Sequence, residues 1–203
     1  MMSEIQLIRD EIEVVREVFS DALKFTSAFN VTTESALPFG LKPHTRSVSW
    51  LIEQVVCQSI KSHSTEIDVS DVDYDLPDTE LHDIEFSKNG TKYFVNVKSH
   101  QADKKPNKND ISAVVKLYER YRDQPSYRLY YACVAIRFDS IHQNRRILFV
   151  ETDMVVFSPQ FLPLYINPTN DKIQAFYVHT PKLRTRVEFL DELRKNSKTL
   201  KLR

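Results

Sequence analysis

The spacing of apolar side chains along the chain predicts several helices. Apolar residues recur every three or four positions over residues 4–24, with Ser3 in the N-cap position and acidic residues in the first turns. A second stripe of the same period runs from about Ser47 to His63. Further helices are expected from about Asp110 to Arg122 and from about Arg184 to Lys195.

Strict alternation of apolar and polar residues predicts strands elsewhere. Residues 81–88 and 91–99 alternate and are joined by Asn89-Gly90, the strongest short signal for a hairpin. Further strands are expected at 128–138, 146–152 and 172–179, a surface loop at the acidic segment 66–80, and no definite element at 153–170. This order of elements predicts an α/β or α+β fold, with a mixed central sheet flanked by helices, in one domain over residues 1–203.

The hairpin pattern divides its side chains between two faces. A two-residue turn at Asn89-Gly90 would place Asp83 opposite Asn96. One face then belongs to the core and carries Ile84, Phe86, Tyr93, Val95 and Val97; the other carries Asp83, Glu85, Asn96 and Lys98. A slip of one residue would bury those polar groups, so the register is strongly specified.

The polar face has the chemistry of a metal-assisted site. Oxygen-bearing side chains on neighbouring strands have Cβ atoms about 5 Å apart, so both can reach one hard cation. A lysine on the same face, such as Lys98 beside Asp83 and Asn96, can orient a water molecule or steady the charge on a phosphate. The same pattern also fits the solvated outer face of a hairpin, where polar residues alternate by default.

The charge distribution and the composition narrow the choice of function. The net charge is +0, yet residues 1–87 hold 6 Lys and Arg against 17 Asp and Glu, and residues 88–203 hold 22 against 11. The basic half fits phosphate binding, unless the two halves interleave in space. The sequence shows neither an apolar run of about 18 residues nor a signal peptide, and Cys57 and Cys133 lack CxxC spacing. These features are typical of a cytoplasmic protein without membrane association.

Asp83, the run Asn96-Val97-Lys98 and Glu53 on the preceding helix resemble the signature of the PD-(D/E)XK nuclease superfamily. That signature is an acid at the end of one strand and an acid-x-lysine on the next. Over roughly residues 45–150 the chain is similar to blunt-cutting type II restriction endonucleases of the EcoRV/HincII kind. The resemblance implies a restriction-endonuclease-like core at 46–150, preceded by a helix and connector at 1–45 and followed by sheet and helix elements at 151–203.

The resemblance also implies an activity and roles for particular residues. It implies a homodimeric, site-specific double-stranded DNA endonuclease that uses Mg²⁺, with Mn²⁺ as a substitute. Asp83 would be the central metal ligand and Lys98 the catalytic lysine at the attacking water. Glu53 would be a supporting acid that reaches metal-bound water or positions Lys98. Each has a structural alternative, since Glu53 also suits a solvated helix and Lys98 the end of an exposed strand. The helix over 4–24 would serve as a dimer element or pack within the chain.

Asn96 departs from the family pattern, which has Asp or Glu at this catalytic and metal-binding position. Three explanations are open. Glu85 on the same strand face as Asp83 would supply the missing charge as a metal ligand. The residue would be an engineered Asp→Asn change. Or the chain would be a pseudonuclease that binds DNA without cutting it.

Two polar segments are candidates for DNA contact. The loop from His100 to Asp110 combines lysines for phosphates with amides for base edges: Gln101, Lys104, Lys105, Asn107, Lys108 and Asn109. The segment Asp139 to Arg146 offers Asn144, Arg145 and Arg146, and the region of Arg184 and Arg186 is a third candidate. A solvated lysine loop is the alternative for the first segment. Rival functions are a structure-specific repair or junction nuclease of the same fold, a non-catalytic DNA-binding protein, and an unrelated α+β protein.

Overall fold

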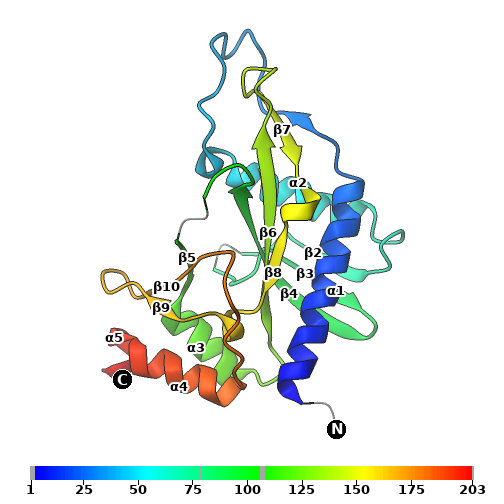
Figure 1. The fold of residues 1–203 in the computed structure, drawn as a ribbon. Helices are drawn as coiled ribbons and strands as arrows, with labels where there is room; N and C mark the ends of the chain where they lie inside the picture. Colours follow the sequence, from blue (N-terminus) through cyan, green and yellow to red (C-terminus); the bar gives the residue numbers. More distant parts are fainter. Residues whose placement is uncertain (1–2, 78, 106–107, 203) are drawn as a thin grey trace.

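The computed structural model describes residues 3–77, 79–105 and 108–202. Within them the chain folds as an α+β protein, with a curled mixed sheet between helices (Figure 1). The strand order is β1-β7-β6-β4-β3-β2, and β8 also pairs with β6. The strands are β1 Phe29–Asn30, β2 Ser70–Asp73, β3 Ile84–Lys88, β4 Thr91–Gln101, β6 Leu129–Phe138, β7 Arg146–Phe149 and β8 Val155–Phe157. Strand β4 runs parallel to β6, and the other pairs of this sheet are antiparallel.

The hairpin of β3 and β4 confirms the predicted turn. Asn89 and Gly90 both have positive φ, 52° and 75°, as a two-residue turn of the favoured hand requires. The predicted register holds from Lys88↔Thr91 to Ile84↔Val95. The predicted pairing of Asp83 with Asn96 is wrong, because the ladder ends at Ile84. The Asp83 N–H donates to the Val95 carbonyl at 2.9 Å, and its carboxylate accepts from the Val97 N–H at 2.7 Å.

The central sheet is covered on both faces. The predicted apolar face of the hairpin is confirmed, since all five of its residues are buried in one core cluster with α1 (Glu4–Lys24) and α2 (Ser49–Ser62). On the other face, Tyr131, Cys133 and Phe157 pack with α3 (Val114–Asp123) and α4 (Arg186–Asn196). The polar hairpin face is therefore partly covered rather than fully solvated, and the side chain of Asn96 is buried.

A second, antiparallel sheet lies beside α3 and has the order β5-β10-β9 (Figure 1). Its strands are β5 Asn109–Ala113, β10 Lys172–Ala175 and β9 Tyr165–Ile166. The helix expected from Asp110 is therefore wrong at its start, because residues 109–113 pair with β10 and α3 begins only at Val114. Strand pairing has overridden the helical spacing of the apolar residues there.

Three other expectations need adjustment. The acidic segment 66–80 contains β2, and the strand expected at 172–179 ends at Ala175. The undefined segment 153–170 folds as short pieces that include β8, β9 and the 3-10 helix Pro159–Phe161. Two more 3-10 helices, Thr45–Ser47 and Glu151–Asp153, and the short helix α5 (Lys198–Lys201) complete the elements of the described residues.

Helix α1 packs within the chain along its apolar stripe. Its buried Glu11 pairs with Arg128, just before β6, at 2.6 Å and accepts a hydrogen bond from the hydroxyl of Tyr130 at the start of β6. The stripe is thus used for the core, as the alternative of packing within the chain expected, and dimer formation through α1 stays a prediction. Among the described residues, every helix is too short or too polar to cross a membrane.

Candidate active site

Lys98 lies between two carboxylates that come from different elements. Its Nζ is 3.7 Å from Asp83 Oδ2 and 3.9 Å from Glu53 Oε1, and it donates to the Val97 carbonyl at 3.1 Å. Strand β4 holds Lys98, the residue just before β3 is Asp83, and the second turn of α2 carries Glu53. The structure thus brings these three residues together, although Asp83 and Glu53 lie 15 and 45 positions before Lys98 in the sequence.

Burial changes the acidity of both carboxylates. The Glu53 side chain is 25% exposed, and burial raises its pKa from 4.5 to about 7, against the lowering effect of Lys98. Burial also raises the pKa of Asp83, while Lys98 and the Val97 N–H oppose the rise. Glu53 can therefore take up or release a proton near neutral pH, as general acids and bases do.

Asn96 is fixed by its amide group. Its Nδ2 donates to the Leu81 carbonyl at 3.0 Å, and its buried Oδ1 has no hydrogen-bond partner among the described residues. An unpartnered buried oxygen is costly unless water or a cation reaches it. Together with the carboxylates of Asp83 and Glu53, it is the kind of oxygen ligand that Mg²⁺ prefers, so the chemistry of these three side chains fits that cation.

The site contains two acids and an amide rather than a cluster of acids. Within residues 3–77, 79–105 and 108–202, no group of three or more His, Cys, Asp or Glu side chains is arranged to hold a metal ion. Glu85, the expected source of the missing charge, instead pairs with Lys92 at 2.6 Å and lies 3.4 Å from His82 Nε2. Glu85 would therefore have to break its contacts with Lys92 and His82 to serve as a metal ligand.

Glu53 and Lys98 open into a polar cleft of about 640 Å³. Its lining comes from segments far apart in the chain: His44, Thr45, Arg46, Ser49, Glu53, Lys98, Ser99, Gln101, Lys104, Lys108, Asn109, Asp110, Asn167, Gln174 and Tyr177. Basic side chains outnumber acidic ones along it, since Arg46, Lys104 and Lys108 accompany Lys98. A cleft with this excess of positive charge attracts polyanions.

Most of the expected DNA-contacting loop reaches this cleft. Gln101, Lys104, Lys108 and Asn109 line it, and Lys105 lines an adjoining pocket that shares Gln101, Lys104 and Asn109. Several of these side chains also have partners within the chain. Gln101 is buried, Lys104 donates to the Pro43 carbonyl at 3.2 Å, and the Lys108 ammonium lies 4.2 Å from the centre of the Tyr165 ring. Asn107 lies outside the described residues.

The second expected segment lies elsewhere. Asn144, Arg145 and Arg146 do not belong to the lining of the cleft. Arg145 donates to the Leu37 carbonyl at 2.9 Å and so ties the turn between β6 and β7 to the loop before α2. Asn144 adopts a left-handed backbone with φ 61°, and Arg146 pairs with Asn30 across β7 and β1. The contacts and backbone conformations of Asn144, Arg145 and Arg146 thus give these three residues structural roles.

The third candidate, Arg184 and Arg186, is used inside the protein. Arg184 is buried and donates to the Gln160 carbonyl at 3.0 Å, and Arg186 donates to the Tyr121 carbonyl at 2.7 Å. Both arginines therefore hold the segment before α4 against the core.

The sequence interpretation missed one wall of the cleft, which includes Asp110, Asn167 and Gln174 from the small sheet and its surroundings. The signal was present in β10, where Ile173 and Ala175 are buried and alternation turns Gln174 to the other face. What the sequence did not reveal is that β5 pairs with β10, which brings Asp110 beside Gln174.

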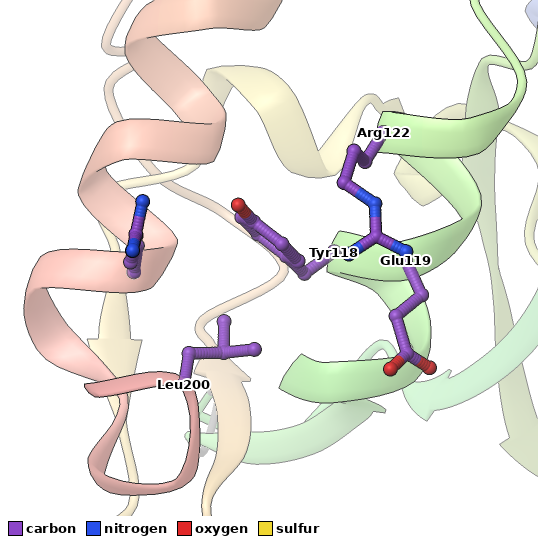
Figure 2. Close-up of a pocket in the computed structure, with 5 residues that line it drawn as sticks. Tyr118, Glu119, Arg122 and Leu200 are labelled. Atoms are coloured by element: carbon purple, nitrogen blue, oxygen red, sulfur yellow. The ribbon is translucent and has the colours of Figure 1, made fainter. Parts of the chain in front are cut away.

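Another pocket lies between α3 and the C-terminal helices and has a volume of about 240 Å³ (Figure 2). Tyr118, Glu119 and Arg122 of α3 face Arg194 of α4 and Leu200 of α5 across it. Figure 2 shows the Tyr118 ring turned into the gap between α3 and the facing helix. This pocket is smaller than the cleft and does not combine a lysine with two carboxylates.

No protein-family model matches the chain, and no curated protein matches its sequence significantly. A functional assignment therefore depends on the geometry of the cleft and on the motif itself.

Proposed function

We propose that the protein is a metal-dependent endonuclease that hydrolyses phosphodiester bonds of double-stranded DNA at a specific site, as type II restriction enzymes do. One observation carries the proposal. Lys98 Nζ lies 3.7 Å from Asp83 and 3.9 Å from Glu53 where a basic cleft opens. Paired acids beside a lysine serve phosphoryl chemistry, and the surrounding cations suit the substrate.

The residues have distinct roles in this proposal. Asp83 and the side-chain oxygen of Asn96 would hold Mg²⁺ or Mn²⁺, which polarises water and offsets phosphate charge when bound. Lys98 orients the attacking water and stabilises the charge that develops on the phosphate. Glu53, with a pKa of about 7, accepts a proton as the water attacks phosphorus in line and the 3′-oxygen leaves.

Asn96 favours a second candidate, a DNA-binding protein of the same fold that does not cut. A neutral amide lowers the charge available to a divalent cation. Its hydrogen bond to the Leu81 carbonyl also gives the amide a structural role that a carboxylate cannot take. The two candidates share the cleft and the DNA substrate and differ in hydrolysis alone.

Cutting both strands of a symmetric site calls for two copies of the active site, so we propose that the protein acts as a homodimer.

Cys57 and Cys133 are unpaired and buried, which suits a reducing compartment such as the cytoplasm. The test of the proposed function is Mg²⁺-dependent cleavage of supercoiled plasmid by the Asn96→Asp variant, in which the acid of the pattern is restored. Adding Lys98→Ala to that variant should abolish cutting, and adding Asn196→Ala, an exposed change on α4, is the control.

A further inference from the structure

Asp110 organises the amide side chains on the small-sheet wall of the cleft. Its Oδ1 accepts a hydrogen bond from Gln174 Nε2 and its Oδ2 one from Asn170 Nδ2, both at 2.7 Å. Asn167 hydrogen-bonds to the same carboxylate. The hydrogen bond from Gln174, followed by those from Asn170 and Asn167, outweighs desolvation and holds the pKa of Asp110 below its usual value, so it stays ionised at neutral pH.

Gln174 differs from the two asparagines in what it has left to offer. The Oδ1 atoms of Asn167 and Asn170 accept backbone N–H groups, from Thr169 at 3.0 Å and Lys172 at 3.2 Å. Among the described residues, the side chain of Gln174 is bonded to Asp110 alone. An amide group has one acceptor oxygen and two N–H donors, so Gln174 keeps its Oε1 and one N–H for a ligand in the cleft.

A donor and an acceptor side by side on a fixed amide match one base edge in particular. In the major groove, adenine presents the N7 acceptor beside the N6 donor, and Gln pairs with both. A small β-ribbon fits that groove. The lysines and arginine of the same cleft, Lys104, Lys108 and Arg46, are placed for the flanking phosphates.

We propose that Gln174, held in orientation by Asp110, reads an adenine in the major groove, which makes the small sheet the element that determines sequence preference. The inference rests on the proposed function, since it requires duplex DNA in the cleft. It goes further by assigning base recognition to a strand outside the acid-x-lysine hairpin and by specifying the base.

The experiment is a binding selection from a duplex pool with a randomised segment, performed on the full chain without divalent metal. The parent chain is expected to enrich duplexes with adenine at fixed positions. Gln174→Ala should lose that preference by roughly 5- to 150-fold, because a bidentate base contact is worth about that much discrimination. Asp110→Ala should weaken the preference in the same direction, and Asn196→Ala should leave it unchanged.

A paired exchange keeps the test decisive if the alanine variants unfold. Asp110→Asn combined with Gln174→Glu preserves a hydrogen bond between the two side chains but converts the reader into a carboxylate. A carboxylate accepts from cytosine N4, so the enriched base should change from adenine to cytosine. Thermal unfolding of each variant shows which selections report on folded protein.

One result overturns the inference while the proposed function stands, namely a Gln174→Ala variant that enriches the same adenines as the parent. A parent that retains duplex DNA without any base preference overturns the inference and the site specificity of the proposed nuclease, and leaves its DNA binding in place. A parent that retains no duplex at low salt overturns both the inference and the proposed function.

Discussion

The Nδ2 of Asn96 donates a hydrogen bond to the carbonyl oxygen of Leu81 at 3.0 Å. This bond ties the middle of β4 to the segment that leads into Asp83, two residues further on. Asn96, which departs from the family pattern, therefore also helps to position Asp83, the acid that conforms to it. Its amide is suited to the fold, and its oxygen can bind a divalent cation but brings no negative charge to it.

Asn96→Asp is expected to lower the free energy of unfolding by about 1–3 kcal/mol in a metal-free buffer. The change removes the donor to Leu81 and places a buried carboxylate near Asp83 and Glu53. Mg²⁺ should restore part of that loss, because the added charge strengthens cation binding. Denaturant unfolding with EDTA and with Mg²⁺ measures both effects.

Asn196→Asp is the matched control, since Asn196 also donates to a backbone carbonyl but is exposed on α4. Asn196→Asp should lower the free energy of unfolding less than Asn96→Asp does, and Mg²⁺ should not change the stability of the Asn196→Asp protein. Equal costs at the two positions, or an Asn96→Asp protein that Mg²⁺ does not stabilise, would contradict the roles assigned to Asn96.

Glu53→Gln is expected to stabilise the protein at pH 8 and to change it little at pH 4. The folded pKa of Glu53, about 7, lies above its ordinary value of 4.5. The parent therefore loses stability as the pH rises from 4.5 to 7, by up to about 3 kcal/mol, and loses no more from this group at higher pH. Urea titrations of both proteins across this range measure the difference, which should be flat with pH if Glu53 titrates normally.

Gly40→Ala is expected to lower the free energy of unfolding more than Gly90→Ala does, although both glycines have positive φ, 81° and 75°. A Cβ at Gly40 would overlap the Gln143 carbonyl oxygen, whereas a Cβ at Gly90 meets no atom within 4 Å. Gly90→Ala should cost about 1 kcal/mol for its backbone conformation, and Gly40→Ala roughly 3 kcal/mol. Similar losses in thermal unfolding would show that the loop before α2 does not pack on the β6–β7 turn.

Lys108→Ala is expected to weaken binding to all duplex sequences alike. Removing one phosphate contact should lower the slope of log affinity against log salt by about 1. Lys24→Ala, on the exposed end of α1, is the control and should leave the slope unchanged. Fluorescence anisotropy at several salt concentrations measures the slopes, and identical slopes for the parent and Lys108→Ala would remove Lys108 from the DNA interface.

The features that the sequence predicted depend on residues close together in the chain, and the features that it missed depend on residues far apart. Asn89-Gly90 and the alternation around it predicted the hairpin, its register as far as Ile84 and its buried face, because these depend on neighbours along the chain. Asp83 departs from the ladder because its carboxylate replaces a backbone partner of Val97, which periodicity cannot reveal.

The same distinction applies to the wall of the cleft. Ile111 continues the helical spacing of Val114 and Leu117, yet residues 109–113 pair with β10, which lies some 60 residues further on. The amide group on Gln174 therefore acquires its partner Asp110 through tertiary structure alone. The proximity of Lys98 to Glu53 was predicted through family resemblance rather than through spacing, and the structure supplies its geometry.

Cleavage of supercoiled plasmid in Mg²⁺ shows whether Asp83, Lys98 and an acid at position 96 form a nuclease site. The parent, Asn96→Asp, Lys98→Ala and the double variant Asn96→Asp with Lys98→Ala are compared, with Asn196→Asp as the control. We expect discrete fragments from Asn96→Asp, little or no cutting by the parent and by Asn196→Asp, and none by either protein that lacks Lys98. Cutting that survives the loss of Lys98, or no cutting by Asn96→Asp in Mg²⁺ or Mn²⁺, would contradict the nuclease assignment.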